Sequence, residues 1–110
     1  MNEEELIKAC EYGDLEKVKL LVEKGADINL EYYNWTPLTK ASGEGHLNIV
    51  QYLVENKAKI NKENGYDWTA LMCASMNGRL DIVEYLVDKG ANINIKNGES
   101  WTALMWASME

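Results

Sequence analysis

The sequence has no phenylalanine, one proline and one histidine among its 110 residues. A single histidine and two separated cysteines, Cys10 and Cys73, do not provide the paired ligands of a zinc site. No run approaches the roughly 20 apolar residues that a transmembrane helix needs, and the start, Met1 to Glu5, lacks the basic and apolar regions of a secretory signal. We therefore expect no metal ion, no cofactor and no membrane partner, and an intracellular, cytoplasmic location.

Positive charge is also scarce. Eleven Lys and Arg residues stand against 18 Asp and Glu residues, which leaves a formal net charge of −7. Because a nucleic acid would meet a protein of the same charge sign, we expect no DNA or RNA partner.

The polar residues do not form a recognisable catalytic group. His46 would need a nearby nucleophile and an orienting carboxylate. Ser42 precedes it by four residues, but Ser75 and Ser108 repeat that position without a following histidine, so these serines are assigned an architectural role. Residues 43–45 (Gly-Glu-Gly) lack the lysine and the preceding strand of a phosphate-binding loop. We expect no catalytic residues and a protein that is not an enzyme.

What the sequence does contain is an internal repeat. Trp-Thr-Pro-Leu at 35–38 returns as Trp-Thr-Ala-Leu at 68–71 and 101–104, at intervals of 33 residues. The second half of the unit, residues 45–54, returns at 78–87, and residues 13–22 are an earlier, more divergent copy. A period of this length is typical of a solenoid, in which each unit buries its apolar face against the next.

Each unit predicts a short helix, a turn, a longer helix and a loop. Thr36 and Thr69 are placed to cap the short helix, and Pro37 follows at the first helical position, where a missing N–H costs nothing. In the longer helix, Leu47, Val50, Leu53 and Val54 fall on one face, which a neighbouring repeat has to cover.

A 33-residue unit with Thr-Pro-Leu, a central glycine and a Gly-Ala-Asp-Ile-Asn ending resembles the ankyrin repeat. The resemblance covers the whole chain and implies an all-α solenoid of stacked helix-turn-helix pairs with β-hairpin-like loops. We expect one domain, residues 1–110, of about three and a half repeats. Its parts are an N-terminal capping repeat at 1–31, a second repeat at 32–64, a third at 65–97 and the first half of a fourth at 98–110.

Stacking also separates the two cysteines. Cys10 and Cys73 would lie two repeat steps apart, and helices pack about 8–10 Å apart in each layer. That spacing exceeds the limit of roughly 7 Å between the Cα atoms of a disulfide. Two reduced, packed thiols are expected, in agreement with a reducing compartment.

The family usually has a histidine after Thr-Pro-Leu, whereas Thr39, Met72 and Met105 stand at this position here. We expect the bracing between neighbouring turns to be weaker or replaced by methionine packing. The one histidine, His46, lies at the turn between the two helices of the second repeat, where the resemblance implies a structural role.

Two further departures concern the backbone. Lys57 stands where Gly25 and Gly90 end the longer helix of the flanking repeats, so it is expected to adopt a left-handed conformation at a cost of about 1 kcal/mol. The loop at 29–35 is one residue shorter than the loop at 61–68, and its fingertip should therefore have a different shape.

The resemblance implies a concave groove that binds protein partners. Trp35, Trp68 and Trp101 occupy the same place in successive repeats and would form a row with a spacing of about 10 Å. Candidate partner-binding residues at the groove and the fingertips are Tyr32, Tyr33, Trp35, Glu44, Tyr66, Trp68, Met76, Asn77 and Trp101. In the competing interpretation, each indole packs on its neighbour and only stiffens the hairpins. Both interpretations hold if one indole face is packed and the other is free.

We expect a non-catalytic protein–protein interaction module. Because the groove mixes aromatic and acidic residues, its partner should carry apolar and basic residues. A small ligand or a glycan that stacks on the tryptophan row is the alternative function.

The carboxyl end, 98–110, would leave apolar surface uncovered, and three explanations stay open: truncation of a longer repeat protein, a natural half-repeat cap, or self-association. A monomer is expected, with self-association as the alternative. The residues involved would be Leu104, Met105, Trp106 and Met109.

Overall fold

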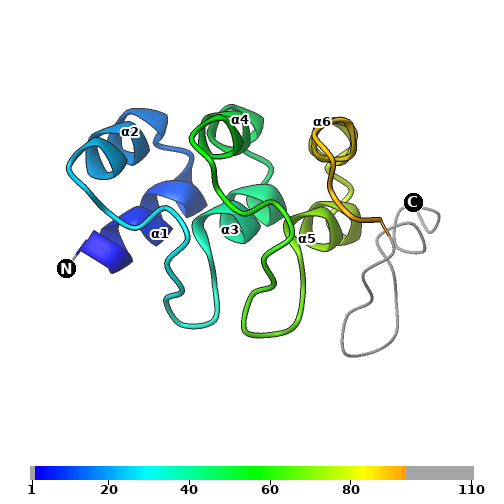
Figure 1. Cartoon of the computed structure of the whole chain (residues 1–110), viewed down its shortest axis with the longest axis horizontal. Coiled ribbons are helices and arrows are strands. Elements are labelled where there is room, and N and C mark those ends of the chain that lie inside the picture. Colours follow the sequence, from blue (N-terminus) through cyan, green and yellow to red (C-terminus); the bar gives the residue numbers. More distant parts are fainter. Residues whose placement is uncertain (1, 94–110) are drawn as a thin grey trace.

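The computed structural model describes residues 2–93, and predictions that concern other residues lie outside it. Six helices follow one another in this part of the chain. They are α1 (Asn2–Tyr12), α2 (Leu15–Glu23), α3 (Pro37–Glu44), α4 (Leu47–Glu55), α5 (Ala70–Met76) and α6 (Leu80–Asp88). Helices α1, α3 and α5 form one layer and α2, α4 and α6 form a second (Figure 1). The expected all-α repeat fold is confirmed.

Threonine caps define the start of α3 and α5. The Thr36 side chain accepts a hydrogen bond from the Thr39 backbone N–H at 3.1 Å, and Thr69 accepts one from Met72 N–H at 3.3 Å. A second hydrogen bond joins the same two residues, because the Thr39 hydroxyl accepts from the Thr36 N–H at 3.0 Å. The residue that replaces the usual histidine therefore completes a capping box in its own repeat. The predicted caps are confirmed.

The outer helices bury one side against the inner layer. Val50 and Leu53 of α4 are fully buried, while Leu47 and Val54 are partly buried against the same core. Ile49, which the sequence pattern did not assign to this face, is fully buried as well. The apolar stripe of α4 is wider than predicted, because α4 lies between α2 and α6 as well as on α3.

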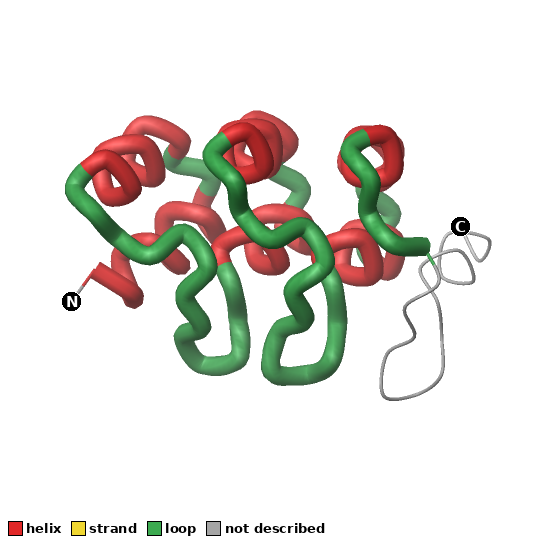
Figure 2. The backbone as a smooth tube through the Cα atoms, in the orientation of Figure 1, coloured by secondary structure: helices red, strands yellow, loops and turns green. Residues whose placement is uncertain are grey.

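The loops between the helix pairs project from the α1–α3–α5 layer in the same direction (Figure 2). In the first loop, Tyr32 and Trp35 exchange backbone hydrogen bonds across Tyr33 and Asn34, whose φ angles are 48° and 74°. In the second loop the Asn64 N–H donates to the Trp68 carbonyl at 2.8 Å, across three residues instead of two. The fingertips differ in shape, as predicted.

Side chains also join each repeat to its neighbour. The Asn29 Oδ1 accepts from the Lys59 N–H, and the Asn61 Oδ1 accepts from the Asn92 N–H, both at 2.8 Å. His46 Nε2 lies 2.9 Å from the Glu11 carbonyl oxygen, which gives this histidine the structural role expected of it. These bonds hold the repeats in register and so set the spacing of the hairpins above the inner helices.

A candidate partner-binding groove

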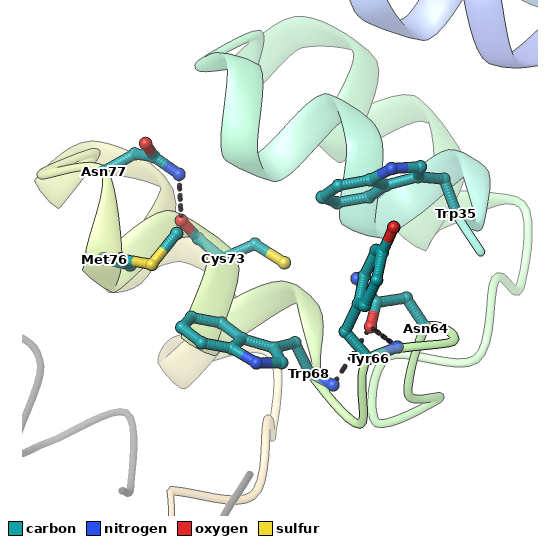
Figure 3. Close-up of a pocket in the computed structure, with 7 residues that line it drawn as sticks. All are labelled: Trp35, Asn64, Tyr66, Trp68, Cys73, Met76 and Asn77. Carbon is teal, nitrogen blue, oxygen red and sulfur yellow. Dashed lines mark hydrogen bonds between the residues drawn. The ribbon is translucent and has the colours of Figure 1, made fainter. Parts of the chain in front are cut away.

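A pocket with a volume of about 440 Å³ opens between the second and third repeats. Its walls come from the base of the first hairpin, the second hairpin and one face of α5 (Figure 3). The lining residues are Trp35, Asn64, Tyr66, Trp68, Cys73, Met76 and Asn77. The volume falls in the range of about 300–1,000 Å³ that is common for ligand pockets.

Two indoles form facing walls. Trp35 and Trp68 each precede a helix-capping threonine, so the caps of α3 and α5 constrain the backbone from which the two rings project. Figure 3 shows the rings on opposite sides of the pocket, with the Cys73 sulfur directed toward the space between them. Tyr66 meets Trp35 edge to face, with 6.1 Å between ring centroids. Both indoles are partly buried and pack against the core, so neither is a freely exposed side chain.

The second hairpin is held rigidly from within and from the side. The Asn64 Oδ1 accepts from the backbone N–H groups of Tyr66 at 2.8 Å and Trp68 at 3.1 Å. The Gly65 N–H donates to the Asn34 carbonyl of the first hairpin at 2.9 Å. A Cβ atom at Gly65 would lie 2.6 Å from Asn34 Cγ, so this close approach of the hairpins requires glycine.

Lys40 places a positive charge beside the pocket. Its ammonium nitrogen lies 4.6 Å from the Trp35 ring centroid and 3.9 Å from a Glu44 carboxylate oxygen. The Lys40 side chain is 16% exposed, whereas that of Glu44 is 43% exposed. The cation is therefore held against the indole, and its carboxylate partner faces water.

The thiol at the pocket is neutral. Burial raises the pKa of Cys73 to about 12, although the nearby Lys40 ammonium acts in the opposite direction. Burial likewise raises the pKa of Cys10 to about 12. Both cysteines are free and buried, as expected from the repeat spacing. Cys73 thus contributes a soft apolar surface to the pocket and not a nucleophile.

Five of the nine candidate residues line this pocket: Trp35, Tyr66, Trp68, Met76 and Asn77. Tyr32 and Tyr33 instead stack edge to face on the first hairpin, with 4.5 Å between centroids. Desolvation and, to a smaller extent, the Glu4 carboxylate of α1 raise the pKa of Tyr32. Glu44 is exposed on α3 and pairs with Lys40. Trp101 lies outside the described residues.

Asn64, Cys73 and Lys40 were not predicted as part of the site. Asn64 precedes Gly65, and an Asn-Gly pair is a turn signal that could have been noticed. Cys73 and Lys40 occupy the same position of successive repeats, in the second turn of the inner helix. Repeat position alone would have placed both near the groove.

Two kinds of site are absent from the described part of the chain. Within residues 2–93, no group of three or more His, Cys, Asp or Glu side chains could hold a metal ion. None of the six described helices has the length and apolar character to cross a membrane.

The family model for ankyrin repeats (three copies) matches residues 2–64 and 61–110. This chain belongs to the ankyrin-repeat family. Ankyrin repeats are non-catalytic modules that generally mediate protein–protein interaction.

Curated relatives share parts of the chain. Alpha-latrotoxin-Lh1a of Latrodectus hasselti is 48% identical over 61 residues, which cover 54% of this chain and 4% of that protein. The 2-5A-dependent ribonuclease of Mus musculus is 42% identical over 64 residues, covering 54% of this chain and 9% of that protein. BTB/POZ domain-containing protein 3 of Schizosaccharomyces pombe is 43% identical over 61 residues, covering 54% of this chain and 12% of that protein. The matched region is thus a small part of each relative.

Proposed function

We propose that this chain binds a protein segment in the groove between its second and third repeats, with the hairpin fingertips as additional contacts. The observation that carries the proposal is the pocket between Trp35 and Trp68, which gathers two indoles, a phenol and a methionine around about 440 Å³. Tryptophan and tyrosine supply much of the binding energy at protein interfaces when a partner buries them. The partner we propose carries apolar and basic residues, because the chain has a net charge of −7.

Rigid walls also favour binding. The caps at Thr36 and Thr69 and the Asn64 hydrogen bonds constrain the backbone that carries the aromatic rings before a partner arrives. A preformed pocket loses little conformational entropy on association, so more of the contact energy appears as affinity. Two buried, unpaired thiols are suited to a reducing compartment, and we propose the cytoplasm as the site of action.

The test is selection from a phage-displayed library of random dodecapeptides against the whole chain. Enriched peptides are resynthesised and their dissociation constants measured by fluorescence polarisation. Trp68→Ala is expected to weaken binding by at least about tenfold, as for a central aromatic anchor. Tyr33→Ala, at the first fingertip, is expected to have a smaller effect because Tyr33 does not line the pocket.

Leu80→Ala is the matched control, since Leu80 is a large exposed apolar residue of α6 that does not line the pocket. Unchanged binding by Leu80→Ala together with loss by Trp68→Ala supports the groove. Peptides that bind Trp68→Ala as well as the parent chain would contradict it. Failure of the library together with binding to a glycan array, abolished by Trp68→Ala, would support the alternative of a glycan site.

A further inference from the structure

The charge around the Trp35–Trp68 pocket distinguishes between the kinds of side chain that could enter it. Aromatic walls accept either an apolar group or a cation, because the face of an indole attracts positive charge. An acidic protein with an aromatic pocket would at first sight favour a cation. Three features of the structure argue the other way, and the inference that they carry rests on the proposed function.

The first feature is the lining itself. None of the seven lining residues is a carboxylate. The Asn64 Oδ1 already accepts two backbone N–H groups, and the Cys73 carbonyl accepts from the Asn77 side-chain amide at 2.9 Å. A guanidinium or ammonium group in the pocket would lose water and find no opposite charge among the lining residues within 2–93, which is unfavourable.

The second feature is Lys40. Its ammonium lies 4.6 Å from the centroid of Trp35 and so already interacts with the negative electrostatic potential of this ring. The Glu44 carboxylate, 3.9 Å from the ammonium, is largely exposed and therefore only partly offsets this charge. A second cation beside Trp35 would meet like-charge repulsion, whereas an uncharged side chain would not.

The third feature lies outside the pocket. Glu63 and Asp67 are exposed residues of the hairpin that carries Tyr66 and Trp68. Asp67 has a φ of 64°, which follows from its place in the tight three-residue turn between Asn64 and Trp68. Two acidic groups therefore lie on the second hairpin, while the charge nearest to the Trp35 ring is the Lys40 ammonium, with Glu44 as its exposed partner.

We propose that the Trp35–Trp68 pocket takes an uncharged apolar side chain of the partner, such as leucine, methionine or phenylalanine, and that Lys40 excludes cationic side chains from it. Basic residues flanking the apolar anchor then lie against the acidic groups of the second hairpin. Lys40 is a specificity-determining residue in this arrangement, and it acts by its charge on what the aromatic walls accept.

The test uses blocked amino acids as probes of the pocket. The whole chain is labelled with 5-fluorotryptophan, and the ¹⁹F signals of Trp35 and Trp68 are assigned by single Trp→Phe substitutions. The N-acetyl methylamides of leucine, phenylalanine and arginine are then titrated separately. The leucine and phenylalanine amides are expected to shift both signals saturably, and the arginine amide to bind at least about fivefold more weakly.

The decisive variant is Lys40→Met, which keeps the aliphatic stem over Trp35 and removes the charge. It should strengthen binding of the arginine amide by about fivefold or more and leave binding of the leucine amide within about twofold. Lys40→Gln serves as a second variant in case the methionine alters the fold. Lys8→Met is the matched control, because Lys8 is the corresponding lysine of the first repeat, is exposed, and pairs with Glu4 at 2.9 Å.

Equal binding of arginine and leucine amides by the parent chain, or no change in selectivity in both Lys40 variants, would overturn the inference. Failure of the proposed function looks different. If selected peptides bind in the groove but place arginine or lysine between the tryptophans, the proposed binding function is supported and the exclusion of cations by Lys40 is contradicted. If neither peptides nor blocked amino acids perturb the signals of Trp35 or Trp68, both the proposed function and the exclusion of cations by Lys40 are contradicted.

Discussion

At the scale of single residues, Lys57 is held in a conformation that favours glycine. Its φ is 74°, and the glycines at the same position of the flanking repeats, Gly25 and Gly90, have φ values of 102° and 95°. A left-handed residue other than glycine costs about 1–2 kcal/mol. The left-handed conformation predicted from sequence for this residue is confirmed.

Lys57→Gly should therefore raise the free energy of unfolding, by about 0.5–1 kcal/mol once the greater flexibility of glycine in the unfolded chain is counted. Urea denaturation followed by circular dichroism measures the change. Lys24→Gly is the control, because Lys24, the C-cap residue of α2, has an ordinary φ of −82°. This substitution should lower the free energy of unfolding. A Lys57→Gly chain no more stable than the parent would show that the strain is relieved elsewhere.

The two buried thiols make stability depend on alkaline pH. Burial raises the pKa of Cys10 and of Cys73 to about 12, so the folded chain keeps protons that the unfolded chain loses above about pH 8.5. The free energy of unfolding should fall between about pH 9 and pH 12, by up to about 1.4 kcal/mol per pH unit for each thiol.

Urea midpoints at pH 7.5, 9 and 10 check this decline. In the double variant Cys10→Ala, Cys73→Ala the decline should be shallower but still present, since burial also raises the pKa of Tyr52 and Tyr85. An identical decline in parent and double variant would show that the thiols do not contribute.

At the scale of secondary-structure elements, the repeats are joined by asparagine side chains. The Asn29 Oδ1 accepts from the Lys59 N–H at 2.8 Å and so connects the loop after α2 to the loop after α4. Asn29→Ala should lower the free energy of unfolding by about 1 kcal/mol, because the Lys59 N–H loses its acceptor. The specific readout is hydrogen exchange at the Lys59 amide, which should become faster.

Asn29→Asp provides the comparison for that substitution, because a carboxylate oxygen can still accept the bond. Asn56→Ala tests a bond within one helix, from Asn56 Nδ2 to the Tyr52 carbonyl, and should leave exchange at Lys59 unchanged. Slow exchange at Lys59 in Asn29→Ala would mean that the hydrogen bond does not protect this amide.

The elements were predictable because their signals are local. Thr36 followed by Pro37 marks a helix start within two residues, and the apolar spacing in α4 predicts its buried face. The pocket was only partly predictable, because its walls are brought together by stacking. That Trp35 and Trp68 fall near one another follows from the repeat, but the position of the Lys40 ammonium on Trp35 depends on side-chain packing in three dimensions.

At the scale of the whole molecule, the stack gives equivalent residues different burial. Leu47 begins α4 and Leu80 begins α6 at the same repeat position. Leu47 is partly buried, in a helix against which α6 packs, whereas Leu80 is 60% exposed. Within residues 2–93, α4 is followed by a further outer helix and α6 is not, and we attribute the difference in exposure to that helix.

Leu47→Ala is expected to lower the free energy of unfolding by about 1–2 kcal/mol, while Leu80→Ala should lower it by less than about 0.5 kcal/mol. Both are measured by urea denaturation under the same conditions. Since residue type, helix position and substitution are identical, the pair isolates the effect of the covering helix. Equal losses would indicate that Leu80 is covered in solution.

The two hairpins differ in length by one residue, and this difference is absorbed entirely at their tips. The inner helix that follows each hairpin, α3 or α5, begins with the same threonine cap. A fingertip can therefore gain or lose a residue without a change of register in the helix stack. Insertion or deletion at a fingertip is therefore a second route, besides substitution, by which the residues presented beside the groove can change.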